Sequence, residues 1–184
     1  MKTKYILHGG FTPKNKNENN EDFYKEILKD APEGAKILIV PFAKDIDRIP
    51  VSVARVTAEF NKNKWQEKFD FEVANEESFI KQIESSNVIY FQGGKTLKLL
   101  EVLKKFSNLK KMFEGKIIAG ESAGANVLGK FFYSPSANGV FEGLGLLPIK
   151  VIPHYSLKYR DVFKDTGSDL DCLYLKEYQY KVFK

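Results

Sequence analysis

Short apolar runs alternate with amphipathic stretches over the first two thirds of this 184-residue chain. The apolar runs predict strands at residues 4–9, 36–41, 69–74, 87–94 and 116–120. The amphipathic stretches predict helices that begin near residues 20, 49, 78, 95 and 123. Strands and helices that alternate with short connections are typical of a mostly parallel sheet covered on both faces by helices.

The pattern changes after Lys130. Residues 131–155 are rich in glycine, proline and aromatic side chains, which predicts extended segments and loops over the edge of the sheet. Residues 173–183 alternate between polar and apolar and predict one or two antiparallel strands. We therefore expect a single α/β domain over residues 1–184, built as a three-layer sandwich with a mostly parallel central sheet and antiparallel strands near the carboxyl end.

Composition excludes several classes of function. The net charge of +5 is modest, and no stripe of basic residues interleaved with aromatics is present, so we expect no nucleic-acid partner. The longest apolar runs are too short to span a bilayer, so we expect no membrane partner. The single cysteine, Cys172, cannot form an intramolecular disulfide, which favours a cytoplasmic location. No cluster of His, Cys and Asp has metal-ligand spacing, so we expect neither a metal nor a cofactor.

The stretch from Lys116 to Gly129 carries the clearest chemical signal. Its apolar residues lead into the spacing Gly120-x-Ser122-x-Gly124, which matches a nucleophile elbow, a sharp turn from a strand into a helix. A serine hydroxyl at such a turn has backbone N–H groups and the positive end of a helix dipole beside it. Both would stabilise an oxyanion, so we predict that Ser122 is a nucleophile.

A serine nucleophile needs a base, and histidine is the usual one. His154 follows the apolar run 149–152, at the end of a predicted strand, and is the better of the two histidines. His8 ends the first predicted strand, and we place it outside the catalytic set. The carboxylates that could complete a triad are Glu142, before His154, and Asp161, Asp165, Asp169, Asp171 and Glu177, after it.

Four segments in collinear order carry a resemblance to a known family: residues 92–100 (QGGKTLKLL), 120–129 (GESAGANVLG), 153–155 (PHY) and 175–177 (LKE). They resemble the motifs of the aspartyl dipeptidase (dipeptidase E) family of serine peptidases, relatives of cyanophycinase with a class I glutamine amidotransferase-like fold. The resemblance implies a triad in the chain order Ser122, His154, Glu177. It also implies an oxyanion hole from the backbone of Gly93, Gly94 and Ala123.

The chain departs from the family pattern at two of these segments. Lys95 stands where asparagine is common after the glycine pair, and Tyr178 stands where glycine commonly follows the triad glutamate. The family's preference for an amino-terminal aspartate requires a cation in the pocket. The candidates for this substrate-binding role are Arg160, whose guanidinium could hold a carboxylate with two hydrogen bonds, Lys158 and Lys95.

The resemblance implies a serine peptidase that hydrolyses short peptides, some with an amino-terminal aspartate, through an acyl-enzyme on Ser122. Two alternatives share the fold. One is a non-catalytic binding or regulatory protein, and the other is an amide or ester hydrolase with a non-peptide substrate. We expect a short peptide as the partner of this chain, and a monomer or homodimer as its state.

Overall fold

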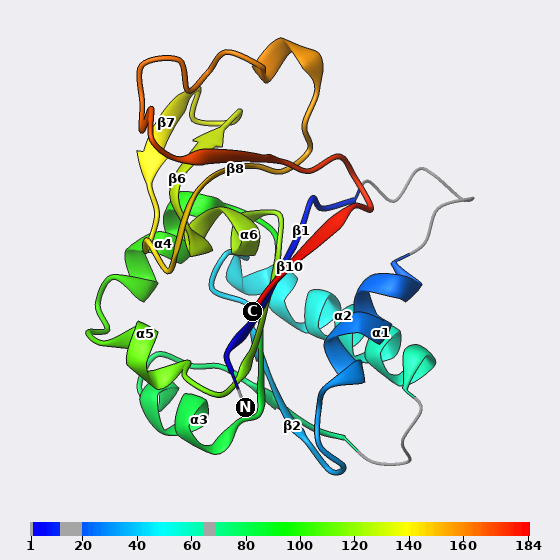
Figure 1. Ribbon diagram of the computed structural model, residues 1–184. Helices are drawn as coiled ribbons and strands as arrows, with labels where there is room; N and C mark the ends of the chain where they lie inside the picture. Colours follow the sequence, from blue (N-terminus) through cyan, green and yellow to red (C-terminus); the bar gives the residue numbers. More distant parts are fainter. Residues whose placement is uncertain (1, 12–19, 65–68) are drawn as a thin grey trace.

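The computed structural model describes residues 2–11, 20–64 and 69–184, and its centre is a six-stranded sheet (Figure 1). The strands lie in the order β10-β1-β5-β4-β2-β3. Five of them are parallel, and β10 pairs antiparallel with β1 at one edge. Their bounds are β1 (Lys4–His8), β2 (Lys36–Val40), β3 (Asp70–Val73), β4 (Val88–Phe91), β5 (Ile117–Glu121) and β10 (Tyr180–Phe183).

Helices cover both faces of this sheet, because the strand residues are apolar on both sides. Ile37 and Ile39 of β2 pack in one cluster with side chains of α1 and α2, whereas Leu38 and Val40 pack in another with side chains of α3 to α6. The fold is therefore the predicted three-layer α/β arrangement. The helices are α1 (Glu21–Lys29), α2 (Ile49–Asn63, after the 3-10 turn η1, Ile46–Arg48), α3 (Phe79–Ser85), α4 (Thr96–Leu103), α5 (Leu109–Met112) and α6 (Ala123–Leu128).

A second sheet of four strands, in the order β7-β6-β8-β9, lies beside α4 and α6 (Figure 1). We predicted extended segments and loops for most of this region, and the extended segments prove to be strands of a second sheet, which was not predicted. In it, β6 and β8 are parallel, as are β8 and β9, and β7 is antiparallel to β6. The bounds are β6 (Gly129–Ser134), β7 (Gly139–Glu142), β8 (Leu147–Ile152) and β9 (Asp171–Tyr174), and the 3-10 turn η2 (Leu157–Tyr159) follows β8.

The alternating stretch at the carboxyl end divides between the two sheets. β10 is antiparallel, as expected, but β9 pairs parallel with β8 in the second sheet. Alternation of polar and apolar residues predicts that a segment is a strand with one buried face, but not which strand is its partner. Residues 175–179 connect β9 to β10 and so pass from the second sheet to the main one.

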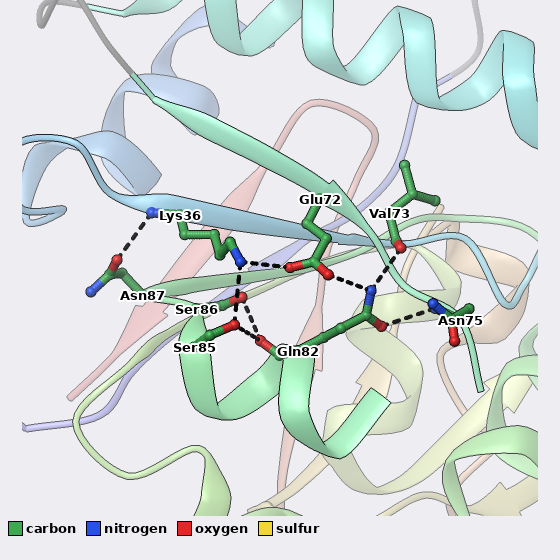
Figure 2. A network of polar contacts seen from close by, with 8 residues as sticks. All are labelled: Lys36, Glu72, Val73, Asn75, Gln82, Ser85, Ser86 and Asn87. Atoms are coloured by element: carbon green, nitrogen blue, oxygen red, sulfur yellow. Dashed lines mark hydrogen bonds and ion pairs between the residues drawn. The ribbon is translucent and has the colours of Figure 1, made fainter. Parts of the chain in front are cut away.

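A polar network fixes the edge strand β3 to its neighbours (Figure 2). Gln82 of α3 donates from Nε2 to Oε1 of Glu72 (2.8 Å) and to the carbonyl of Val73 (3.0 Å). Its Oε1 accepts from the N–H of Asn75 at 3.0 Å, and Nζ of Lys36 lies 2.9 Å from Oε2 of Glu72. Because Gln82 is buried, these bonds satisfy polar atoms that water cannot reach.

The described helices are short, and the longest of them, α2, has 15 residues. Within residues 2–11, 20–64 and 69–184, none combines the length and the apolar character needed to cross a bilayer. The same ranges contain no group of three or more His, Cys, Asp or Glu side chains placed to hold a metal ion.

Candidate active site

Ser122 lies at the sharp turn between β5 and α6, where the sequence predicts an elbow. Its backbone has φ 51° and ψ −100°, a conformation that costs about 1–3 kcal/mol for a residue with a side chain. The turn is this tight because its glycines let three segments approach. A Cβ on Gly120 would lie 2.5 Å from the carbonyl carbon of Gly124, and one on Gly124 would lie 2.3 Å from the carbonyl oxygen of Phe91.

Three side chains that are distant in sequence form one chain of hydrogen bonds. Nε2 of His154 lies 3.0 Å from Oγ of Ser122, and Nδ1 of His154 lies 3.0 Å from Oε1 of Glu177. Both partners of the second bond are about one-third exposed, so the site is open to a substrate. Among the carboxylates that the sequence left open, Glu177 is the one that the described structure places on His154.

Three consecutive carbonyls at the end of β1, those of residues 8–10, accept hydrogen bonds from the segments that carry these side chains. The carbonyl of His8 accepts from the N–H of Ser122, that of Gly9 from His154, and that of Gly10 from Tyr178, each at 2.9 Å. Tyr178 follows Glu177 directly. The end of β1 therefore sets the relative positions of all three members of the hydrogen-bonded chain, a role that spacing along the sequence does not reveal.

The side chain of His8 stabilises the turn that follows β1. Its ring is fully buried and stacks on Phe23 at 4.4 Å between centroids, and Nδ1 accepts from the N–H of Gly10 at 3.1 Å. Burial, and then the nearby ring of His154, lower the pKa of His8 to about 4. The imidazole is therefore neutral near pH 7, as its role of hydrogen-bond acceptor requires.

The residues predicted to form an oxyanion hole lie around Ser122. A Cβ on Gly93 would lie 3.3 Å from Cβ of Ser122, Gly94 lines the cavity beside Ser122, and Ala123 begins α6. Among the described residues, the N–H groups of Gly94 and Ala123 have no hydrogen-bond acceptor. Both N–H groups are therefore free to donate to a bound ligand.

A cavity of about 360 Å³ opens beside Ser122 and His154. The second sheet supplies one wall through residues 133–136, and the residues around η2 supply another through Tyr159. The lining also includes Gly94 and Thr96, before and at the start of α4, and Asn126 of α6. The second sheet, which the sequence did not predict, therefore shapes the space next to the serine.

None of the three predicted cations lines this cavity. Nζ of Lys95 is exposed and pairs with Asp45 at 2.8 Å. Arg160 is exposed beside Tyr174, whose hydroxyl donates to the Arg160 carbonyl at 3.4 Å. Lys158 lies with Nζ 4.7 Å from the ring centroid of Tyr159, a residue that lines the cavity.

Glu121 precedes Ser122 directly at a strand end, and the sequence reasoning gave it no role of its own. The side chain is buried, and Oε2 accepts from the hydroxyl of Tyr90 at 2.7 Å. Oε1 lies 3.9 Å from the guanidinium of Arg55, which in turn lies over the ring of Phe11 at 4.5 Å. Burial, and then the charge of Glu121, raise the pKa of Tyr90 well above its ordinary value.

Comparison with solved structures finds the same fold. A peptidase from an acI-B1 Actinobacterium superposes with a TM-score of 0.70 at 21% identity, covering 100% of this chain and 84% of that one. A candidate peptidase E from Listeria monocytogenes EGD-e superposes with a TM-score of 0.66 at 15% identity, covering 100% and 98%. At such identities the likeness concerns the fold alone. A search of curated protein sequences found no match.

The chain has a serine at a nucleophile elbow, hydrogen-bonded to a histidine, and both residues follow strands that have parallel neighbours. This arrangement is typical of α/β hydrolases in the broad sense. The model of peptidase family S51 matches residues 6–171, which is most of the chain. The chain belongs to this family, the dipeptidase E family of serine-type peptidases. The match includes Ser122 and His154 but ends before Glu177, so the position of Glu177 depends on the geometry described above.

Proposed function

We propose that this chain hydrolyses short peptides through an acyl-enzyme on Ser122. In this proposal His154 is the general base and then the general acid, and Glu177 holds the imidazole in the tautomer that accepts a proton on Nε2. The observation that carries the proposal is the pair of 3.0 Å contacts that join Ser122, His154 and Glu177.

The proposed reaction has two stages. Oγ of Ser122 attacks the peptide carbonyl while Nε2 of His154 takes its proton, and a tetrahedral oxyanion forms. The N–H groups of Gly94 and Ala123, with Gly93 as neighbour, donate to that oxyanion. The C–N bond then breaks, His154 protonates the leaving amine, and a water molecule attacks the ester by the same route. The products are the free acid, the amine and the restored serine.

The resemblance and the cavity of about 360 Å³ at the serine both support a small substrate. A cavity of this volume suits one side chain and its neighbouring backbone, not an extended polypeptide. The resemblance also predicts a preference for an amino-terminal aspartate. That preference stays a prediction, because the cavity lining supplies no cation for it.

The test is hydrolysis of a panel of dipeptides and aminoacyl amides by the purified protein. Ser122→Ala should abolish hydrolysis and labelling by a fluorophosphonate probe, with the circular dichroism spectrum unchanged. The matched control is Ser107→Ala, at an exposed serine between α4 and α5, which should retain both. If the wild type neither hydrolyses any member of the panel nor reacts with the probe, the chain is a non-catalytic member of the fold. Hydrolysis of esters or non-peptide amides alone would indicate the other alternative.

A further inference from the structure

Arg55 of α2 reaches the edge of the active site from the helix layer on one face of the main sheet. The cavity beside Ser122 is lined from α4 and α6, which belong to the layer on the other face. Nε2 of the buried Gln92, the residue before the oxyanion glycines, donates to the carbonyl of Ser52 at 3.1 Å. This bond ties α2 to the end of β4, about one helical turn before Arg55.

Contacts with three segments place the guanidinium of Arg55 next to the candidate triad. It lies 4.5 Å from the ring centroid of Phe11, and that ring lies 6.1 Å from the ring of Tyr178, the residue after the triad glutamate. Nη2 of Arg55 lies 3.9 Å from Oε1 of Glu121, the residue before the nucleophile. The same oxygen would lie 2.9 Å from a Cβ on Gly93, so the guanidinium borders the predicted oxyanion hole.

The hydrogen-bond donors of this guanidinium are not used within the described part of the chain. At 3.9 Å the contact with Glu121 is an ion pair but not a hydrogen bond, and the contact with Phe11 is made by the face of the group. The Arg55 side chain is 38% exposed, so a ligand can reach it from solvent. Its planar fork of N–H groups matches the two oxygens of a carboxylate.

Lys44 adds a second positive charge to this region. It follows Ala43, whose carbonyl oxygen would lie 2.5 Å from a Cβ on Gly94. Burial lowers the pKa of Lys44, the charge of Glu121 raises it, and the charge of Arg55 lowers it further, so the three groups act on one another. Two cations face one carboxylate here, which leaves a positive charge for an anionic ligand to balance.

The charges of a dipeptide decide which of its ends can lie beside Arg55. The acyl residue carries an ammonium group, which the two cations would repel, and the leaving residue carries a carboxylate, which they would attract. That carboxylate is one residue, about 3.5 Å of chain, beyond the scissile bond. Gly93 spans the corresponding gap in the protein, because a Cβ there would lie 3.3 Å from Cβ of Ser122 and 2.9 Å from Oε1 of Glu121.

We propose that Arg55, with the charge of Lys44 beside it, binds the terminal carboxylate of the leaving residue. Arg55 is then a specificity-determining residue that favours dipeptides with a free carboxyl end over amidated or longer peptides. The proposal rests on the proposed function for the position of the scissile bond. A carboxylate on the side chain of the acyl residue has the same chemistry, and the experiment below separates the two sources.

The first test compares Ala-Leu with Ala-Leu amide, which has nearly the same shape but no terminal carboxylate. Binding is measured by calorimetry on Ser122→Ala, which cannot turn the ligand over, and release of leucine or leucine amide is measured on the wild type. We expect Ala-Leu to bind about tenfold or more tightly and to have a kcat/KM higher by a similar factor, mainly through KM. Equal binding, tighter binding of the amide, or no binding of Ala-Leu would overturn the proposal. Selective binding without hydrolysis would count against the proposed function only.

Variants of Arg55 in the Ser122→Ala background identify the group responsible. Arg55→Gln should bring the two affinities to within about threefold by weakening Ala-Leu alone. Arg55→Lys keeps the charge but not the planar fork and should show an intermediate preference, and it decides the question if Arg55→Gln does not fold. The matched control is Arg48→Gln, at an arginine that is 77% exposed before α2, which should keep the full preference. Equal weakening of both ligands by Arg55→Gln would mean that Arg55 acts through packing, and the proposal would be wrong.

A second pair of ligands, Asp-Leu amide and Asn-Leu amide, tests the other source of a carboxylate. Both lack the terminal carboxylate, and they differ only in the side chain of the acyl residue. We expect Arg55→Gln to leave the ratio of their affinities unchanged within about twofold. If the protein prefers Asp-Leu amide and Arg55→Gln removes that preference, Arg55 binds the acyl side chain and the proposal is overturned.

Discussion

A side chain on Gly10 would overlap the ring of His154. A Cβ at Gly10 would lie 2.3 Å from Nε2 of His154, the nitrogen that contacts Ser122, and 3.0 Å from Cβ of Ser122. Gly10 also has φ +85°, a conformation that glycine adopts readily and other residues adopt at a cost. The contact between serine and imidazole is therefore possible only while residue 10 lacks a side chain.

We first predict that Gly10→Ala lowers kcat by at least about 100-fold, because displacement of a catalytic ring by about 1 Å has an effect of that size. The control is Gly34→Ala. Gly34 also has a positive φ, +67°, but a Cβ there would meet nothing within 4 Å. Gly34→Ala should lose a similar stability to backbone strain and keep its kcat. Equal kcat values for the two variants would show that the close approach at Gly10 is unimportant.

The second prediction concerns the acceptor that His8 provides to the N–H of Gly10. His8→Leu removes it and should lower kcat about tenfold or more, because the unpaired N–H no longer fixes the turn that holds His154. His8→Asn places an oxygen where Nδ1 was and should restore much of the loss, although it fills less space against Phe23. Steady-state kcat and KM for the two variants are the measurement. A role in packing alone would predict the reverse order, with leucine closer to the wild type.

The third prediction is a pH dependence of stability. The pKa of His8 is about 4 in the folded chain and about 6.5 when the chain is unfolded, so between these values the unfolded state binds more protons. Stability from this residue is complete above pH 6.5 and falls as the pH drops toward 4, by up to about 3 kcal/mol. Urea unfolding between pH 4 and 7.5 measures it. His8→Asn should show a shallower decline, and an equal decline in both proteins would refute this origin.

Fourth, Glu177→Gln should lower kcat by roughly three to four orders of magnitude with little change in KM. Glutamine keeps the shape of the side chain but can donate to Nδ1 of His154, which would stabilise the tautomer unable to accept the proton of Ser122. Asp171→Asn, at the first position of β9, is the control for the loss of one negative charge elsewhere in the chain. If Glu177→Gln retained activity, the orienting role would have to be reassigned.

The fifth prediction tests the network around Gln82 (Figure 2). Gln82→Leu removes its three hydrogen bonds to Glu72, Val73 and Asn75, and should lower the free energy of unfolding by about 2–3 kcal/mol. Lys81→Leu, at the exposed neighbouring position, should change it by less than about 0.5 kcal/mol. Denaturant unfolding gives both values. Both folded variants should hydrolyse substrate normally, since α3 contributes nothing to the cavity at Ser122.

Much of the main sheet was predictable because its inner strands, β1, β5, β4 and β2, are buried on both faces. The run at residues 36–41 is apolar throughout, and it becomes β2, buried between two layers of helices. The elbow was also predictable, since Gly120 and Gly124 mark a close approach that larger residues would prevent. The second sheet was not predicted as a sheet, because its strands are short and glycine or proline stands in or at the start of three of them, at Gly129, Gly139 and Pro148. The extent of the domain and the oligomeric state stay predictions.

The candidate site was only partly predictable for a different reason. Ser122 and His154 follow strands, and position alone suggests that they face the same sheet edge. Only the resemblance could select Glu177 among the six candidate carboxylates. The position of Glu177 in space depends on a tertiary hydrogen bond, from the N–H of Tyr178 to the carbonyl of Gly10, which the sequence does not reveal. Lys95 shows that proximity in sequence to a site residue does not predict where a side chain lies. It follows the oxyanion glycine Gly94 in sequence, yet its charge is paired with Asp45, outside the cavity.

Glu177 lies in the connection that leaves the second sheet and leads into β10, the strand that closes the edge of the main sheet beside β1. During synthesis on the ribosome, a chain that has emerged only to residue 170 contains the serine and the histidine but not their carboxylate. We expect nascent chains to stay unreactive until residues 175–183 have emerged and β10 has paired with β1. Reactivity toward a fluorophosphonate, followed on stalled chains of increasing length, should then appear as one late step.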